Sequence, residues 1–172
     1  EATDGAGRSR TYILALPHDP EPDEPIPMVL GLHGALGSAD QFDDSTDLVA
    51  RATDRGFAVV IPSAIEGSWD YGIDGPDDAF LTGLLDSAAA AHCIDLDRVH
   101  VVGMSLGAWK SAVTACAHPG TFASAVLVTV EVRPEGCEPL PILAIHGSAD
   151  QIAPYGEGGD DVEIVGGLAG LS

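Results

Sequence analysis

Short apolar runs recur along the chain, and stretches with a helical pattern separate them. Apolar runs of about four to eight residues bounded by turn residues are typical of strands buried on both faces. A connection that contains a helix places two such strands parallel in one sheet. The sequence therefore predicts an α/β fold with a doubly wound, mostly parallel sheet. The predicted strands are residues 11–16, at an edge, then 28–32, 57–61, 99–102, 123–130 and 141–145, and the predicted helices are residues 40–55, 77–92 and 105–117.

The chain is 172 residues long, which is enough for one domain with a buried core. Apolar residues make up 45% of it, as in globular rather than disordered proteins. No apolar run approaches the ~20 residues of a membrane-spanning helix, so no membrane association is expected. Residues 1–172 are therefore interpreted as a single domain.

The charge of the chain is strongly negative. Twenty-seven acidic residues against seven basic ones give a formal net charge of −20. Such a surface repels phosphate backbones and anionic membranes, which argues against nucleic acid or a membrane as a partner. The acids are scattered, so we interpret them as a solvated shell that favours solubility rather than as a site that recruits a cationic substrate.

One stretch has the pattern of a serine nucleophile. The run at 99–102 leads into Gly103-Met104-Ser105-Leu106-Gly107, and a helical pattern follows directly. The glycines of GxSxG permit a sharp, strained turn that lifts the serine hydroxyl clear of the sheet. A serine also needs a base and a group that stabilises the oxyanion, and the amide of Leu106 at a helix N-terminus can be that group. The motif alone arises often by chance, but a strand before it and a helix after it favour Ser105 as a nucleophile.

A second stretch predicts the other half of an oxyanion hole. His33 and Gly34 end the run at 28–32 and precede a helical pattern. A loop in this place can bring a second backbone amide over the serine, and Ala35 is the candidate. We interpret His33 as a loop histidine that orders the turn, in preference to a catalytic base.

A third stretch supplies a candidate acid. The run at 141–145 is followed by His146 and then by Asp150, so the chain order is serine before aspartate. An aspartate at the carboxyl end of a strand can orient an imidazole and stabilise its cation. The alternative is an ordinary turn-capping aspartate. If Asp150 is catalytic, it lies on the same edge of the sheet as Ser105, with room for an imidazole between them.

Four blocks carry these residues: Leu32-His33-Gly34, Asp95-Leu96-Asp97-Arg98-Val99, Gly103-Met104-Ser105-Leu106-Gly107, and His146-Gly147-Ser148-Ala149-Asp150 through Pro154-Tyr155. Together they resemble the polyhydroxybutyrate depolymerase and feruloyl esterase group of α/β-hydrolases, a pattern that also occurs in carbohydrate esterase family 1. The resemblance extends from about Arg10 to Gly159. It implies an α/β-hydrolase fold and a secreted serine esterase, with Ser105 as nucleophile and Asp150 as the acid of the triad.

The resemblance also implies a mechanism and a partner. Such enzymes form an acyl-enzyme through a Ser–His–Asp route, with no metal and no cofactor, and their partner is a small or polymeric ester. Trp69 falls where they often keep an aromatic side chain near the acyl pocket, but packing on the rim of the core explains it equally well. The sequence does not distinguish ferulate, acetate and hydroxybutyrate as the acyl group, because pocket residues lie on variable loops.

Three cysteines bear on the cellular compartment. Their spacing does not match a zinc site, and an odd number excludes complete pairing within the chain. Cys116 and Cys137 lie in segments that could meet, so a disulfide between them and two free thiols are both open. With that disulfide, Cys93 would be buried and free or paired outside the chain. A disulfide would agree with secretion, and the opening residues EATDG contain no leader, as in a mature secreted protein.

The expected base is missing from the sequence. None of the six histidines follows Asp150, and only 22 residues remain after it. The family adds a further helix, a strand and the loop with the catalytic histidine. We therefore expect an incomplete hydrolase, and an exposed sheet edge that leaves it a monomer or a weak homo-oligomer. An inactive relative and the use of an unexpected histidine are the alternatives.

These observations favour a serine carboxylic-ester hydrolase of the feruloyl esterase, acetyl esterase or polyhydroxyalkanoate depolymerase type. A serine peptidase or a lipase on the same scaffold is the alternative enzyme, although the sequence lacks the large lid insertion of lipases. A hydrolase fold that binds an ester or a glycan without catalysis is the alternative of a different class.

Overall fold

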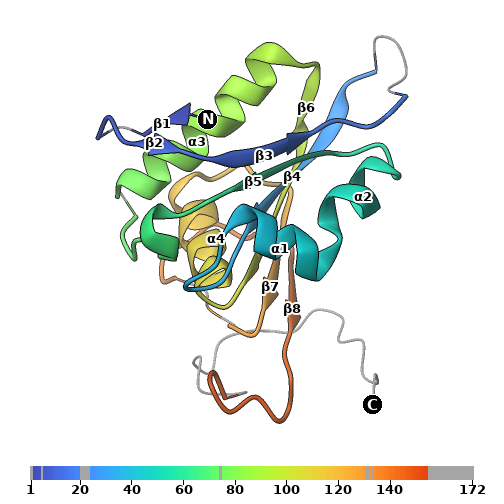
Figure 1. Cartoon of the computed structure of the whole chain (residues 1–172). Helices are drawn as coiled ribbons and strands as arrows, with labels where there is room; N and C mark the ends of the chain where they lie inside the picture. Colours follow the sequence, from blue (N-terminus) through green and yellow to red (C-terminus); the bar gives the residue numbers. More distant parts are fainter. Residues whose placement is uncertain are drawn as a thin grey trace.

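Six strands form one sheet in the order β3-β5-β4-β6-β7-β8 (Figure 1). The computed structural model describes residues 2–4, 6–19, 24–73, 75–130, 132 and 134–154. Every neighbouring pair in this sheet is parallel except β3 with β5, which is antiparallel. The predicted doubly wound, mostly parallel sheet is confirmed. Its strands are β3 (Tyr12–Ala15), β4 (Ile26–Leu32), β5 (Ala58–Pro62), β6 (Ile94–Met104), β7 (Ser124–Val128) and β8 (Ile142–Ile145).

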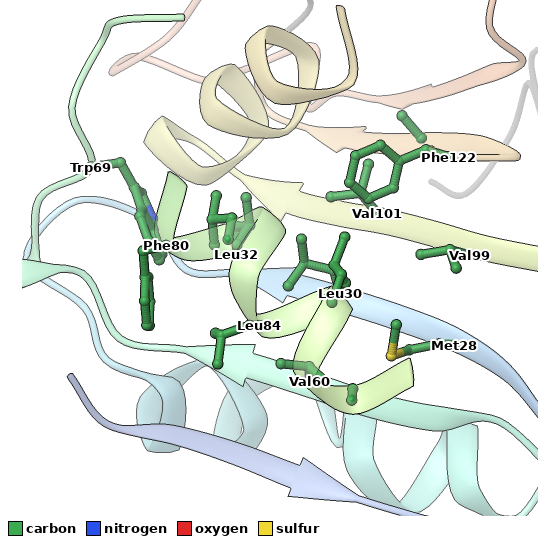
Figure 2. Close-up of a cluster of buried hydrophobic side chains, with 14 of the residues drawn as sticks. Met28, Leu30, Leu32, Val60, Trp69, Phe80, Leu84, Val99, Val101 and Phe122 are labelled. Carbon is green, nitrogen blue, oxygen red and sulfur yellow. The ribbon is translucent and has the colours of Figure 1, made fainter. Parts of the chain in front are cut away.

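One face of the sheet carries the larger apolar core. Leu30, Leu32 and Val60 are each at most 1% exposed, and they pack against the helices α3 (Pro76–Ala91) and α4 (Leu106–Ala117). Figure 2 shows α3 crossing these side chains. Burying a side chain of this size stabilises the fold by about 1.5–3 kcal/mol. This core therefore holds the helix that follows Ser105 against the sheet.

The opposite face carries a smaller core. Val59 and Ile61 alternate with Val60 along β5, and they pack against Phe42 of α1 and against α2. The alternation explains why the inner strands read as continuous apolar runs, since each residue is covered on one face or the other. The two helices here are α1 (Ala39–Thr46) and α2 (Leu48–Thr53).

The single helix predicted over residues 40–55 is wrong in its middle. Asp47 adopts a left-handed conformation with φ of 55°, and the chain begins a second helix immediately after it. Aspartate tolerates this conformation better than most residues. The carboxylate of Asp43 accepts a hydrogen bond from the amide of Val49 at 2.8 Å, which caps the start of α2. The predicted stop at Gly56 is present, with φ of 81°.

An N-terminal hairpin lies outside the main sheet and carries no apolar pattern that could have predicted it. Its strands are β1 (Ala2–Thr3) and β2 (Ser9–Arg10), which pair antiparallel. Asp4 organises the turn, because its carboxylate accepts hydrogen bonds from the amides of Ala6 and Arg8. The carboxylate also forms an ion pair with the Arg8 guanidinium. Burial raises the pKa of Asp4, but these bonds outweigh burial and lower the pKa to about 2.

The cysteine alternatives are resolved in favour of the disulfide. Cys116 and Cys137 are bonded, with their Cα atoms 5.0 Å apart. The bond ties the end of α4 to the segment before β8. Cys93 is free, but it is exposed rather than buried, because it lies in the turn that leads into β6. Among the described residues, no helix is long and apolar enough to cross a membrane.

Candidate active site

Ser105 lies in the turn between β6 and α4. The strand is central in the sheet, with β4 on one side and β7 on the other. The backbone of Ser105 has φ of 54° and ψ of −120°, a conformation that L-residues rarely adopt. Its amide donates to the carbonyl of Val128 at the end of β7, at 2.9 Å. The sequence prediction of a strained serine at the carboxyl end of a central parallel strand is confirmed for the backbone, and the role of nucleophile stays a prediction.

The two glycines of the motif are required by close packing rather than by their own torsion angles. A Cβ at Gly107 would overlap the carbonyl oxygen of Leu32, at the end of β4. A Cβ at Gly103 would overlap the carbonyl oxygen of Gly107 and crowd the hydroxyl of Ser111. The start of α4 therefore lies directly against β6 and the end of β4. This contact fixes where the helix begins and hence where the Ser105 hydroxyl points.

The loop after β4 lies beside the serine. A Cβ at Gly34 would lie 3.5 Å from the Cβ of Ser105, in van der Waals contact, so this loop passes next to the serine. The amide of Leu36 donates to the carbonyl of Gly67, in the short helix η1 (Ile65–Gly67), at 2.7 Å. Leu36 itself has φ of 62°. The bond to Gly67 holds the loop in a strained conformation next to Ser105.

The two predicted oxyanion donors lie in this neighbourhood. Leu106 is the first residue of α4, and the first amides of a helix have no partner inside the helix. Ala35 is exposed. Within the described part of the chain, the amide of Ala35 makes no backbone hydrogen bond, whereas the neighbouring amides of Leu36 and Gly37 donate to the carbonyls of Gly67 and Gly34. Both candidates are thus backbone donors beside Ser105, and their role stays a prediction.

His33 orders this loop, which agrees with the preferred interpretation of the sequence. The amide of Ala64 donates to Nε2 of His33 at 2.9 Å, so Nε2 carries no proton. Nδ1 then carries the proton and donates to the carbonyl of Gly34 at 2.7 Å. Burial lowers the pKa of His33, and the bond to the Gly34 carbonyl opposes that effect only in part. His33 is therefore a neutral, fully engaged side chain and not a free base.

Trp69 supports the same loop from the core. Its side chain is 1% exposed and belongs to the larger core, beside Phe80 (Figure 2). The indole Nε1 donates to the carbonyl of His33 at 2.8 Å, and the two rings lie 4.9 Å apart. Of the two roles considered for Trp69, packing on the core matches the structure, because a side chain this buried does not reach a substrate directly.

Asp150 follows β8 and lies at the same edge of the sheet as Ser105. β6, β7 and β8 are mutually parallel, with Met104 aligned to Val128 and Val128 to Ile145. Strands β6 and β8 are next-but-one neighbours, about 10 Å apart. An imidazole with a hydrogen bond on each nitrogen spans roughly 8 Å between two oxygens. The topology therefore leaves a space of the right order for an imidazole between the two turns.

The carboxylate of Asp150 is held by its own turn. It accepts hydrogen bonds from the amides of Ile152 and Ala153, at 2.9 and 3.0 Å. The bond from Ala153 and then the bond from Ile152 lower the pKa of Asp150, against a smaller opposing effect of burial. The side chain is therefore ionised near neutral pH, as the acid member of a triad must be. The same bonds are those of an ordinary turn cap, so the two interpretations of Asp150 share this geometry.

The histidines divide between the two edges of the sheet. His92 and His118 end helices just before strands begin, and His18 follows the antiparallel β3, so these three lie toward the amino ends of the parallel strands. His100 lies within β6, five residues before Ser105 and thus about 17 Å along the strand.

Only His33 and His146 follow the carboxyl ends of strands. Nε2 of His146 donates to the carbonyl of Ala153 at 2.6 Å. Among the described residues, no histidine is hydrogen-bonded to the hydroxyl of Ser105.

Comparison with known proteins identifies the family. The sequence model of the family described as "Esterase PHB depolymerase" matches residues 10–138, which is most of the chain. The chain belongs to this family. The match contains the loop after β4 and the turn at Ser105, and it ends before β8, so it does not cover Asp150.

Relatives of the family extend the comparison. The NocK protein of Nocardia uniformis subsp. tsuyamanensis is 33% identical over 166 residues, which cover 87% of this chain and 48% of NocK. Feruloyl esterase C of Emericella nidulans is 29% identical over 160 residues, which cover 87% of this chain and 58% of that protein. The chain thus spans about half the length of these relatives.

Solved structures agree on the fold. The crystal structure of a thermostable esterase matches with a TM-score of 0.72 at 22% identity, covering 86% of this chain and 45% of that one. Acetyl xylan esterase from Aspergillus awamori matches with a TM-score of 0.62 at 21% identity, covering 67% of this chain and 45% of that one. At these identities the likeness shows the fold, and the family member described here has the α/β-hydrolase fold.

Sequence reasoning missed one group of residues beside the site. Lys110, the only lysine of this PHB depolymerase-family chain, is fully buried and paired with Asp70. The signal was present, because Lys110 interrupts the apolar pattern of the helix that follows Ser105. Helical spacing places it on the side of α4 where Gly107 and Val113 are buried. A charged residue on a buried helix face indicates a partner nearby.

Proposed function

We propose that the chain is the catalytic core of a serine carboxylic-ester hydrolase that forms an acyl-enzyme on Ser105. The observation that carries this proposal is the backbone of Ser105, with φ of 54° at the junction of β6 and α4. A strained conformation at such a junction costs free energy, and it persists where the surrounding structure requires it. Family membership supports the ester bond as the target, since the matching family is one of esterases.

The mechanism follows from the groups around the serine. A base removes the hydroxyl proton of Ser105, and the oxygen attacks the ester carbonyl to form a tetrahedral intermediate. The amides of Leu106 and Ala35 stabilise the negative charge on the former carbonyl oxygen. The protonated base then gives its proton to the departing alcohol. Water, activated by the same base, attacks the acyl group on Ser105 and releases the acid. The route uses no metal and no cofactor.

The base in this proposal is a histidine that the 172 residues do not include. His33 is held by two hydrogen bonds as a neutral structural side chain, and His146 donates to the carbonyl of Ala153. The other four histidines lie within β6 or toward the opposite edge. Asp150 orients the missing imidazole from β8 and stabilises its cation. The position of Asp150, two strands from Ser105 on the same edge, supports this role.

The proposed substrate class is a carboxylic ester, small or polymeric. Relatives carry the names feruloyl esterase C and acetyl xylan esterase, so aromatic and acetyl esters are the first candidates. We propose secretion as the location, supported by the disulfide between Cys116 and Cys137, since such bonds persist in oxidising compartments.

The test compares two forms of the protein with p-nitrophenyl acetate as substrate. The 172-residue chain is expected to turn over the ester feebly, because Ser105 without a base stays protonated. A longer chain that carries one histidine after Asp150 is expected to be fully active and to lose that activity with Ser105→Ala. A fluorophosphonate probe should label the longer chain on Ser105 and not label the variant.

Two outcomes would contradict the proposal. Robust turnover by the 172-residue chain that Ser105→Ala abolishes would mean that another histidine is the base. A longer chain that stays inactive while binding ester or glycan ligands would favour a non-catalytic binding protein. The lack of a hydrogen bond between the Ser105 hydroxyl and a described histidine is the observation that keeps this second candidate in the test.

A further inference from the structure

Lys110 has an unusual position for the only lysine of an acidic chain. It lies on α4, five residues after Ser105, and its side chain is 0% exposed. Its ammonium donates to the carboxylate of Asp70 at 2.6 Å and to the carbonyl of Gly72 at 3.0 Å. Burying an ammonium is costly unless it is paired and hydrogen-bonded. These two bonds satisfy that condition and join the helix of the serine to the loop after β5.

The pairing continues beyond Asp70, whose side chain is 26% exposed, to the buried side chains of Asp77 and Arg10. Asp70 and Asp77 exchange two hydrogen bonds, each carboxylate accepting from the other's amide, at 2.7 and 2.9 Å. The second oxygen of Asp77 pairs with Arg10 at 2.7 Å. Lys110, Asp70, Asp77 and Arg10 together carry no net charge. The chain of charges connects α4, the loop after β5, α3 and β2, and Arg10 also pairs with Asp4 at 3.4 Å.

The electrostatics of Asp70 agree with a strong clamp. Burial raises the pKa of Asp70, but the hydrogen bond from Lys110 and the one from the Asp77 amide outweigh it, so the pKa lies below its ordinary value. The carboxylate is thus ionised whenever the protein is folded near neutral pH.

The clamp also places an exposed aromatic side chain next to α4. Tyr71 lies between Asp70 and Gly72, the two residues that Lys110 binds. The side chain of Tyr71 is 69% exposed, and its ring meets the ring of Trp109 edge-on at 6.2 Å. Trp109 precedes Lys110 on the same helix. Lys110 thereby holds Tyr71 of the loop against Trp109 of α4, about one turn after Ser105.

The clamp also connects to the loop that carries Ala35. Trp69, next to Asp70, donates to the carbonyl of His33. His33 in turn donates to the carbonyl of Gly34. The peptide bond between Trp69 and Asp70 and these hydrogen bonds together join Lys110 to the backbone of the loop after β4.

We propose that Lys110 is a positioning residue that sets the placement of the Ala35 loop relative to Ser105 by clamping Asp70 and Gly72 to α4. The proposal rests on the proposed function. An oxyanion hole works when both of its amides point at the same atom, and a misplacement of about 1 Å can cost on the order of a hundredfold in rate. α4 begins with the Leu106 amide and also carries Lys110. One helix therefore controls both halves of the oxyanion hole.

The alternative is that Lys110 only satisfies a buried charge network. In that case an apolar side chain of similar volume would serve as well, since replacing a buried ion pair by apolar groups is often neutral for stability. The double variant Lys110→Met with Asp70→Asn tests this directly, because it removes the pair and leaves no unpartnered ammonium or carboxylate. The side-chain oxygen introduced by Asp70→Asn can still accept the hydrogen bond from the backbone amide of Asp77.

The first measurement is amide hydrogen exchange on the 172-residue chain, and it does not depend on catalysis. In the double variant, the amides of Leu36 and Ala64, which donate to Gly67 and His33, are expected to exchange at least tenfold faster. The amides of β6 should keep their protection. The matched control is Asp78→Asn, which removes the negative charge that faces His118 (2.6 Å), at the far end of α4. It should leave the Leu36 and Ala64 amides unchanged.

The second measurement is ester hydrolysis by the longer chain with a late histidine. The double variant is expected to lower kcat about tenfold with little change in KM, because the oxyanion forms only in the transition state. Unchanged exchange of Leu36 and Ala64 would overturn the proposal, whatever the activity. Faster exchange with unchanged kcat would overturn the catalytic consequence. A wild-type longer chain with no esterase activity would overturn the proposed function, and the exchange data would still decide what Lys110 positions.

Discussion

Ser105 and Asp150 both follow the carboxyl end of a parallel strand, but the protein holds the two turns in different ways. The turn at Ser105 is enclosed, since the strand before it has a partner on each side and Gly107 contacts the end of β4. The turn at Asp150 follows β8, which has a neighbour on one side only among the described residues, and it is held by bonds from its own backbone amides.

The difference shows that the serine and the aspartate need different support from the fold. The serine sits in a strained conformation, which only close packing on all sides can maintain. The aspartate needs a negative charge at a set place, and two amides of its own turn provide that at little structural cost. We therefore expect changes to the packing around Ser105 to affect folding, and removal of the Asp150 charge to affect chemistry.

The largest expected effect is on catalysis and comes from Asp150→Asn. In the longer chain with a late histidine, kcat should fall about 10⁴-fold, because a neutral amide no longer stabilises the imidazolium or fixes its tautomer. The free energy of unfolding should change by less than about 1 kcal/mol, because the amide oxygen can still accept the bonds from Ile152 and Ala153. Steady-state kinetics measure kcat, and urea unfolding measures the free energy of unfolding.

The control for this substitution is Asp97→Asn, at an exposed position in the first half of β6. It should leave both quantities unchanged. A similar loss of activity in the two variants, or a large loss of stability in Asp150→Asn alone, would remove the distinction between the turns.

The next largest effect is on stability and comes from Gly107→Ala. The added methyl would overlap the backbone of β4, which has no flexible side chain to give way. We expect the free energy of unfolding to fall by at least about 3 kcal/mol. The matched control is Gly83→Ala in α3, where a Cβ meets nothing within 4 Å. That change should be stabilising by about 0.5–1 kcal/mol, since alanine favours the helix.

Chemical unfolding of the two alanine variants side by side checks this prediction. If Gly107→Ala were as stable as the wild type, the start of α4 would not be fixed by its contact with β4. The account of the strained serine would then need another cause.

The smallest effect concerns pH. The carboxyl of Asp150 is expected to titrate below its ordinary value of about 3.9, because the amides of Ala153 and Ile152 stabilise the charged form. A depressed pKa in the folded state adds stability above the unfolded value, and that stability is lost as the pH falls through the folded value. Since the group is half-buried at an edge, the loss should be small.

An NMR titration of the Asp150 carboxyl carbon measures this midpoint. The same chain in urea gives the unfolded reference. A folded midpoint at or above the reference would mean that the self-capped turn is not formed in solution.

The sequence predictions were accurate where local interactions determine the structure, and less so where long-range interactions do. The apolar runs predicted the inner strands, because a strand covered on both faces has no room for polar residues. The GxSxG pattern predicted the backbone at Ser105, since strand, glycines and helix are adjacent in sequence. The break at Asp47 was not predicted, because a single left-handed residue leaves no mark on an otherwise helical pattern.

The sequence by itself determined the order along the chain of the main strands and helices, the turn at Ser105 and the presence of Asp150 after a late strand. These depend on neighbouring residues and on the period of the apolar pattern. What only the tertiary structure decided is which polar groups meet across the fold. Asp70 and Lys110 are 40 residues apart, and Trp69 and His33 are 36 apart. Their partners are chosen by packing and by the cost of leaving a buried polar group unpaired, which no local pattern records.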